Sequence, residues 1–198
     1  IEYASVAQVC TGYRIAQLNG ALAAPPGHAG DSNGPGTTSG QQGFGFLVPR
    51  GENLRILGTV WNSALFPGAR WAGDSDLGSG KTVKFTSFLG GATDPEICQR
   101  SDAEVAQIVH QELSDIMGIS GPPAAVHVAR WMRALPQYNL GYSRVLAELR
   151  KLCSGTPGIF LAGNYLAGPS LGACVDQARS VAEDVERFAA RNAPRKAT

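Results

Sequence analysis

The sequence lacks the patterns that mark several common classes of protein. It has only 4 cysteines and 3 histidines and no C-x-x-C pair, so a metal site built from thiolates and imidazoles is not expected. Its 17 Lys and Arg are balanced by 16 Asp and Glu, which leaves a formal net charge of +1 and no strongly basic surface for nucleic acid. No apolar run approaches the roughly 20 residues that cross a membrane. These absences favour a small molecule as the binding partner.

The N-terminus carries neither a signal peptide nor a methionine. Because it lacks a basic segment followed by an apolar one, we expect the protein in the cytoplasm or peripherally attached to a membrane. Ile1 already lies in a strand-like segment, which predicts that the chain is cut from something larger. With 198 residues and 43% apolar composition, the chain is long enough to bury one core.

The glycine-rich motifs of nucleotide-binding proteins are absent or incomplete. No G-x-G-x-x-G occurs, so a complete dinucleotide-binding turn is missing. Residues 78–82 (GSGKT) end like a phosphate-binding loop, but Ser75 stands where the first glycine belongs and a strand follows, so we interpret them as a polar hairpin loop. His28, His110 and His127 are scattered and no G-x-S-x-G accompanies them, so no catalytic triad is expected.

The first half of the sequence has the spacing of β-strands. One strand is predicted over residues 1–15, and the Gly/Pro/Ser-rich residues 22–42 that follow predict a flexible loop. Three more strands are predicted over 44–49, 55–62 and 83–89, with turn residues between them. Short connections between consecutive strands favour antiparallel pairing.

A capping box marks the change to helical spacing in the second half. Ser101 and Glu104 can each bond the other's backbone N–H, and Gly118 is a typical stop, so a helix is predicted between Ser101 and Gly118. Its apolar side chains recur on one face. That face is Val105, Ile108, Val109, Leu113 and Ile116.

Further elements are predicted towards the C-terminus. A strand over 125–132 should lead into a turn at Pro136, and a helix should follow over 140–152. Residues 158–162 form a short apolar run between glycines, which predicts a buried strand. A long amphipathic helix should come last. Its apolar face is Cys174, Val175, Ala178, Val181, Ala182, Val185 and Phe188.

The turn between residues 158–162 and the long helix is the strongest candidate for a binding site. Ser170 can cap the helix, whose first N–H groups then point outward. Such a helix start favours negative charge, which a reduced flavin develops along its N1–C2=O edge. The same pattern also fits an ordinary strand–turn–helix packing unit, and these residues alone do not separate the two.

Five segments together resemble the oxygen-dependent protoporphyrinogen oxidases, which are amine-oxidase-like flavoproteins. The resemblance covers about residues 43–187 and depends on the order and spacing of the segments. In this family a flavin-binding domain and a substrate domain alternate along the chain. The segments are GFGFLVPR (43–50), LGTVWNSALFPG (57–68), TSFLGGAT (86–93), ALPQY (134–138) with Trp131 upstream, and the turn 162–174.

The resemblance implies an α+β fold. Residues 1–130 would form part of the substrate-binding domain, with a mostly antiparallel sheet. Residues 131–198 would supply the C-terminal strand and long helix of an FAD-binding domain whose Rossmann half is missing. That half, on another chain, would be a partner.

The resemblance also implies ligand contacts. Porphyrinogen would lie between apolar walls, for which Phe46, Leu47 and Trp61 are candidates, although plain sheet core explains each of them equally well. FAD would be contacted by Trp131, Gly163, Asn164, Pro169, Ser170 and Leu171.

The implied reaction is the oxidation of protoporphyrinogen IX to protoporphyrin IX. Flavin N5 would take a hydride from a meso-bridge carbon, and O2 would reoxidise the flavin with release of peroxide. Positioning rather than side-chain acids would supply the rate, so no catalytic residue is assigned.

Departures from the family pattern leave other activities open. The diphosphate-binding turn is missing, residues 23–42 and 69–80 are insertions, and Tyr142 stands where His is expected. The alternatives are oxidation of coproporphyrinogen III, another enzyme of this type such as a carotenoid desaturase or an amine oxidase, and a non-catalytic tetrapyrrole-binding module.

Overall fold

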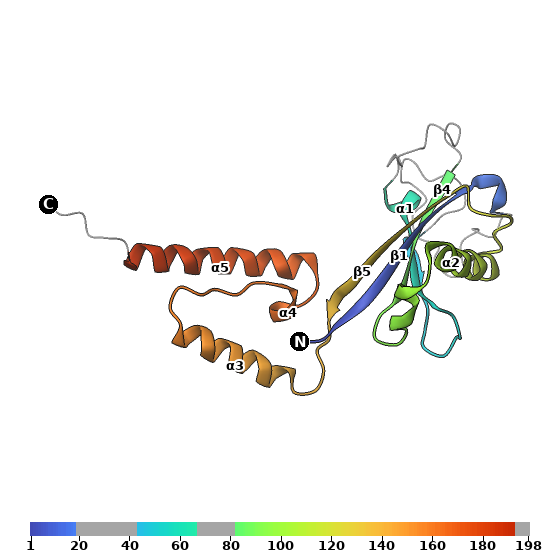
Figure 1. Cartoon of the computed structure of the whole chain (residues 1–198). Helices are drawn as coiled ribbons and strands as arrows, with labels where there is room; N and C mark the ends of the chain where they lie inside the picture. The colour runs from blue at the N-terminus through green and yellow to red at the C-terminus, as the bar shows by residue number, and fades with distance from the viewer. Residues whose placement is uncertain (19–42, 67–81, 193–198) are drawn as a thin grey trace. The chain divides into compact units, whose positions relative to one another are not determined.

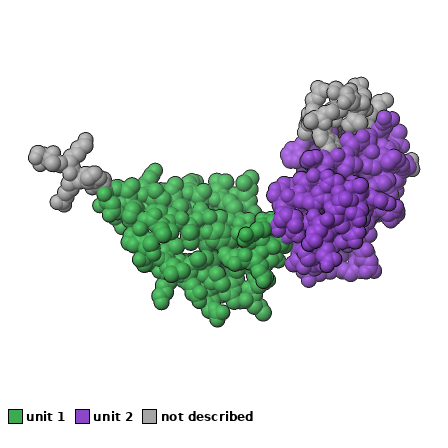
Figure 2. Space-filling model, in the orientation of Figure 1, with its two compact units in different colours: residues 1–4, 133–198 green, residues 5–132 purple. Residues whose placement is uncertain are grey.

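The chain folds into two compact units. The computed structural model describes residues 1–18, 43–66 and 82–192. Residues 5–132 form one unit, here called the sheet unit, and residues 1–4 and 133–198 form the other, here called the helical unit (Figure 2). The functional roles assigned above to residues 1–130 and 131–198 remain predictions.

The sheet unit holds most of the strand residues, and the helical unit is mainly helical (Figure 1). In chain order they are β1 Tyr3–Arg14, a 3-10 turn Ile15–Gln17, β2 Gly45–Leu47, β3 Ile56–Trp61, α1 Asn62–Leu65, β4 Thr82–Gly90, a 3-10 turn Pro95–Gln99, α2 Asp102–Met117, β5 Ala125–Pro136, α3 Tyr142–Gly155, α4 Asn164–Ala167 and α5 Leu171–Asn192.

The sheet has five strands in the order β2-β3-β4-β1-β5. The pairs β2–β3, β3–β4 and β1–β4 are antiparallel. The Ala124 amide donates to the Gly12 carbonyl and the Gln137 amide to the Glu2 carbonyl, so β5 also runs antiparallel to β1. The predicted α+β class with a mostly antiparallel sheet is therefore confirmed, as are the first four predicted strands in their central residues.

Helix α2 and one face of the sheet form the core of the sheet unit. Val9 and Phe85 from the strands and Val109 from α2 are fully buried in one cluster. The Tyr13 hydroxyl lies 3.1 Å from Nδ1 of His110 on α2, which adds a polar contact to this apolar interface. Burial raises the pKa of Tyr13 to about 12, so the phenol stays protonated.

The predicted signals at both ends of α2 are confirmed. The Ser101 hydroxyl accepts from the Glu104 amide at 3.3 Å, and the Glu104 carboxylate accepts from the Ser101 amide at 2.9 Å. Gly118 ends the helix with a φ of 64°. The predicted face was wrong at one position, since Ile116 is 42% exposed and Met117 is buried. The buried positions on α2 are spaced four residues apart and end at Met117, so Ile116 lies beside this row and not in it.

Strand β5 is longer than predicted. It continues to Pro136, which is buried and forms its last residue rather than a turn. A proline is tolerated there because its missing N–H removes no bond from the middle of the ladder. Pairing continues one residue further through the bond from the Gln137 amide to Glu2.

Both predicted helices of the helical unit form. α3 begins at Tyr142, two residues later than predicted, and α5 covers Leu171–Asn192. Neither helix contains a buried residue. The apolar face predicted for the last helix is therefore present in α5 but is not buried within the described residues, and the apolar side chains of α3 are not buried there either.

The buried strand predicted over residues 158–162 is absent. The segment runs back between α3 and α5 without strand structure, and its Phe160 ring packs edge-on against Phe188 at 5.8 Å (Figure 1). A strand needs a neighbour that supplies backbone hydrogen bonds, and no strand of the described residues pairs with this segment. The predicted flexible loop 22–42, the insertions and the GSGK part of the 78–82 motif lie outside the described residues.

One glutamate of α2 fixes the start of strand β3. The Glu112 carboxylate accepts from the Ile56 amide at 2.8 Å and from the Arg55 amide at 2.9 Å. Arg55 in turn forms a two-bond ion pair with Asp94. These bonds join α2 to the sheet over more than 50 residues of sequence.

Replacing Glu112 with alanine should lower the free energy of unfolding by about 2 kcal/mol, because two backbone donors, one on the buried Ile56, lose their acceptor. Glu112→Gln keeps an amide oxygen at the same place and should lose less than half as much. Urea unfolding followed by circular dichroism measures both. An equal loss in the two variants would show that these hydrogen bonds contribute little.

Candidate functional site

The sheet has a second face, opposite α2, which we call the outer face. Side chains alternate along a strand, so the two faces can be assigned from residues of known contact. On β5, Val128 packs against the core, and Arg130 donates to the Arg100 carbonyl at 2.7 Å beside the start of α2. The next residue, Trp131, therefore belongs to the outer face, where it is 48% exposed.

The predicted substrate residues are divided between the two faces. Phe46 pairs with the buried Thr59 and Trp61 with the buried Phe85, and both pack against the core on the α2 side. Leu47 pairs with Gly58, points to the outer face and is 86% exposed. Substrate contact remains a prediction for all three residues, and of the three only Leu47 shares a face with Trp131.

A polar row on the outer face was missed by sequence reasoning. The Thr86 hydroxyl donates to the Asn62 side-chain oxygen at 2.7 Å and lies 3.5 Å from the Cys10 sulfur. Gln8 reaches the same sulfur at 3.9 Å. The signal available in the sequence was the alternation of apolar and polar residues along β1 and β4. The outer face thus combines exposed apolar side chains with hydrogen-bonding groups.

The predicted flavin-facing turn lies in the helical unit and is built on Gly163 and Ser170. The Gly163 amide donates to the Gln177 side chain at 2.8 Å, and its φ of 148° favours glycine. The Ser170 hydroxyl accepts from the Ala173 amide at 3.1 Å, which confirms Ser170 as the cap of α5.

The start of α5 is open. Leu171 is 82% exposed, and a Cβ added to Gly172 would meet no atom within 4 Å. No acceptor for the amides of Leu171 and Gly172 occurs in the described part of the chain. Free N–H groups beside open space fit the electron-rich edge of a flat ring such as a flavin. Pro169 is also exposed, and contact of these residues with FAD remains a prediction.

Two tyrosines hold the backbone just before this helix start. The Tyr138 hydroxyl donates to the Asn164 carbonyl at 2.6 Å, and the Tyr142 hydroxyl donates to the Tyr165 carbonyl. Their rings meet edge to face at 4.9 Å. Removal of water raises the pKa of both phenols, so both remain donors at neutral pH. The sequence marked Tyr142 only as a departure from an expected His.

The Asn164 side chain has longer contacts of its own. It lies 3.5 Å from the Tyr3 hydroxyl and 3.5 Å from the Ala134 carbonyl.

Five of the six predicted flavin residues, all except Trp131, lie in one turn of the helical unit. Trp131 belongs to the sheet unit together with the three predicted substrate residues.

The described residues contain neither a cluster of metal ligands nor a membrane-spanning helix. No group of three or more His, Cys, Asp and Glu side chains there could hold a metal ion. Among the same residues, no helix has the length and apolar composition needed to span a bilayer.

Known proteins resemble this chain in sequence and in structure. A chloroplastic protoporphyrinogen oxidase of Nicotiana tabacum is 33% identical over 156 residues, which are 77% of this chain and 27% of the relative. A coproporphyrinogen III oxidase of Bacillus subtilis is 31% identical over 144 residues, 72% of this chain and 29% of the relative. A crystal structure named as a candidate protoporphyrinogen oxidase of Exiguobacterium superposes with a TM-score of 0.68 at 23% identity, covering 94% of this chain and 35% of that one.

The chain spans less than a third of the length of these curated relatives. The model of the family described as flavin containing amine oxidoreductase matches residues 32–186, well over half of the sequence and the whole stretch from β2 to the middle of α5. This match and the level of identity agree with the resemblance found in the five segments. The chain belongs to the family of flavin containing amine oxidoreductases.

Proposed function

We propose that this chain takes part in the FAD-dependent oxidation of protoporphyrinogen IX to protoporphyrin IX, with O2 as the acceptor. The observation that carries the proposal is the 33% identity over 156 residues to a relative named protoporphyrinogen oxidase. Coproporphyrinogen III is the second candidate substrate, because a relative named for that reaction is 31% identical over a similar length. The two substrates share the macrocycle and differ in their side chains.

The outer face has properties that suit a flat, apolar macrocycle. Leu47 supplies exposed apolar surface on this face, which it shares with the predicted flavin contact Trp131, and the same face carries the polar row around Thr86. A bound flavin would accept a hydride from a meso-bridge carbon and pass its electrons to O2. The chain's own contribution would be to position the two rings and to exclude water, which needs no acidic side chain.

The cofactor would be held only in part by this chain. The open amides of α5 fit the flavin ring, whereas the sequence contains no G-x-G-x-x-G turn for a diphosphate. We therefore propose that a dinucleotide-binding segment acts together with this chain. Exposed apolar residues on α3 and α5, such as Leu152 and Val175, offer surface that such a segment could cover.

Mixing the chain with FAD and the part of the Bacillus subtilis relative that this chain does not match tests the proposal. Each porphyrinogen is supplied separately, and porphyrin is followed by its fluorescence. We expect oxidation at least about tenfold faster than the spontaneous reaction, with release of peroxide. The preferred substrate decides between the two candidates. If the mixture binds FAD but oxidises neither porphyrinogen, the proposed function is wrong.

A further inference from the structure

We propose that Tyr138 and Tyr142 are positioning residues. They clamp the backbone of residues 164 and 165 and thereby fix the orientation of the start of α5, in which its first amides face open space. This inference rests on the proposed function, because the start of α5 is the predicted flavin contact. Neither tyrosine is proposed to touch a reacting atom.

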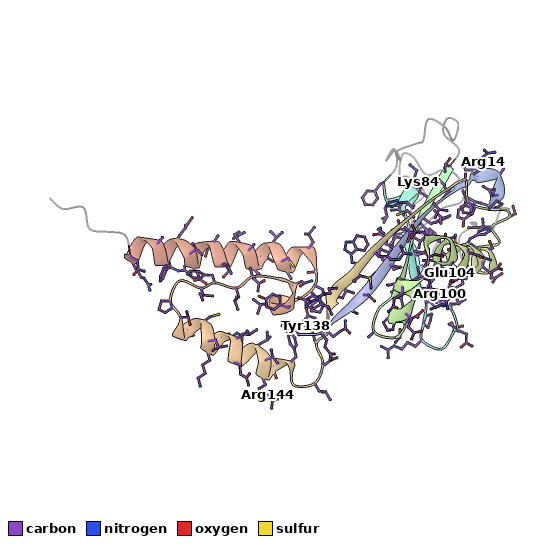
Figure 3. The ribbon with its side chains drawn as sticks, viewed as in Figure 1. Arg14, Lys84, Arg100, Glu104, Tyr138 and Arg144 are labelled. Atoms are coloured by element: carbon purple, nitrogen blue, oxygen red, sulfur yellow. The ribbon has the colours of Figure 1, made fainter. Side chains whose placement is uncertain are left out.

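The hydroxyls bind two consecutive carbonyls of the chain. Tyr138 donates to the carbonyl of Asn164, and Tyr142 donates to that of Tyr165 (Figure 3 labels Tyr138). The two tyrosines are four residues apart, and their rings support each other edge to face at 4.9 Å. One short segment therefore fixes two successive peptide units of α4, a helix of only four residues.

A helix of four residues has little stability of its own. The Gly163 amide is bonded to Gln177, 14 residues further along the chain on α5. With residue 163 tied to α5 and residues 164 and 165 tied to the two tyrosines, the turn is fixed on both sides. The open amides at Leu171 and Gly172 follow shortly after the clamped residues along the chain, and the bond from the Gly163 amide to Gln177 links the turn to α5 itself.

Cys174 provides a reporter that involves no flavin. Its thiol lies in the first turn of α5, is partly buried and donates to the Gly168 carbonyl at 3.8 Å. Movement of the turn should break this weak contact and expose the sulfur. Cys10 and Cys153, which are also partly accessible, are replaced by serine in every protein compared, and Cys98 is buried.

The rate at which a disulfide reagent modifies Cys174 tests the clamp. We expect Tyr142→Phe and Tyr138→Phe each to raise the rate, and the double variant to raise it about tenfold, as expected when hydrogen bonds of ordinary strength are lost. Placing 4-aminophenylalanine at position 142 restores an N–H donor on the same ring and should bring the rate back towards its original value. Tyr165→Phe is the matched control, because the Tyr165 hydroxyl has no hydrogen bond within the described residues.

Unchanged rates in both single variants would overturn the inference. A faster modification of Cys174 that 4-aminophenylalanine at position 142 does not reverse would also overturn it. So would an equal rise in rate in Tyr165→Phe. Either result would show that ring packing rather than the hydrogen bonds holds the turn. The thiol assay contains neither flavin nor porphyrin. Its failure is therefore distinguishable from failure of the proposed oxidation.

Discussion

Replacing Trp131 with alanine is expected to weaken the binding of an isoalloxazine ring about tenfold and to leave the free energy of unfolding nearly unchanged. Stacking of a flat ring on an exposed indole contributes roughly 1 to 1.5 kcal/mol, which corresponds to about that factor in affinity. Trp131 is half exposed on the outer face and is not part of the core cluster, so its removal leaves no cavity. The suitable probe is lumiflavin, because it has no diphosphate and does not need the dinucleotide-binding turn. Quenching of lumiflavin fluorescence gives the dissociation constant.

Met132 offers a matched control. It is the next residue of β5, is 54% exposed and points to the opposite face of the strand. Met132→Ala should leave the affinity for lumiflavin unchanged. If Met132→Ala weakens binding as much as Trp131→Ala does, or if neither variant changes it, the flavin contact of Trp131 is wrong.

Elements with local signals were predicted well. Both ends of α2 follow from side chains within one helical turn of the boundary, namely the Ser101–Glu104 capping box and Gly118. The Ser170 cap of α5 is a signal of the same kind. Such signals act over three or four residues, so the sequence around the boundary determines them.

Features that depend on distant partners were not predicted. Residues 158–162 have the composition of a buried strand, yet a strand also needs a neighbouring strand, and the described residues provide none. β5 extends to Pro136 because its last residues pair with the start of β1, more than 130 residues away in sequence. Periodicity gives the face of an element and its phase, but it does not give the partner.

The candidate site also combines a feature that local sequence predicts with features that depend on distant partners. The turn from Gly163 to Leu171 was recognised from its glycines and its cap, whereas the tyrosine clamp was not, because Tyr138 and Tyr142 meet residues 164 and 165 only after the chain has folded back. Phe46 and Leu47 are neighbours in sequence with similar apolar side chains. Only the register of β2 against β3 shows that one joins the core and the other points outward.

The exposed stripes of α3 and α5 connect the fold to the proposed function. Helices of this length keep their structure in globular proteins mainly through burial of an apolar face. Here the faces are formed and correctly phased, but no residue of either helix is buried. The relatives are more than three times as long as the matched region. We therefore expect additional protein surface, of the kind proposed above for the dinucleotide-binding segment, to cover these faces in the active protein.

Replacing Gly45 with alanine is expected to lower the free energy of unfolding by at least about 3 kcal/mol or to detach β2 from the sheet. A Cβ at this position would lie 2.1 Å from the Thr59 carbonyl oxygen, a backbone atom in the middle of β3. The backbone of Gly45 also has a φ of 146°, which side chains disfavour, and this adds roughly 1 kcal/mol or more. Urea unfolding measures the global loss. Exchange of the Trp61 amide, which donates to the Phe44 carbonyl at 2.8 Å, measures local detachment of β2.

The substitution Gly51→Ala separates the two causes of the loss expected for Gly45→Ala, which are the close backbone approach and the unfavourable φ. The φ of Gly51, 99°, is also unfavourable for alanine, but a Cβ there would meet no atom within 4 Å. Gly51→Ala should therefore show only the conformational cost, about 1 kcal/mol, and leave exchange of the Trp61 amide unchanged. A loss for Gly45→Ala no larger than that for Gly51→Ala would contradict the close backbone approach between β2 and β3. Leu47 is presented on the outer face by this approach, so loss of β2 pairing should also remove it from the proposed substrate surface.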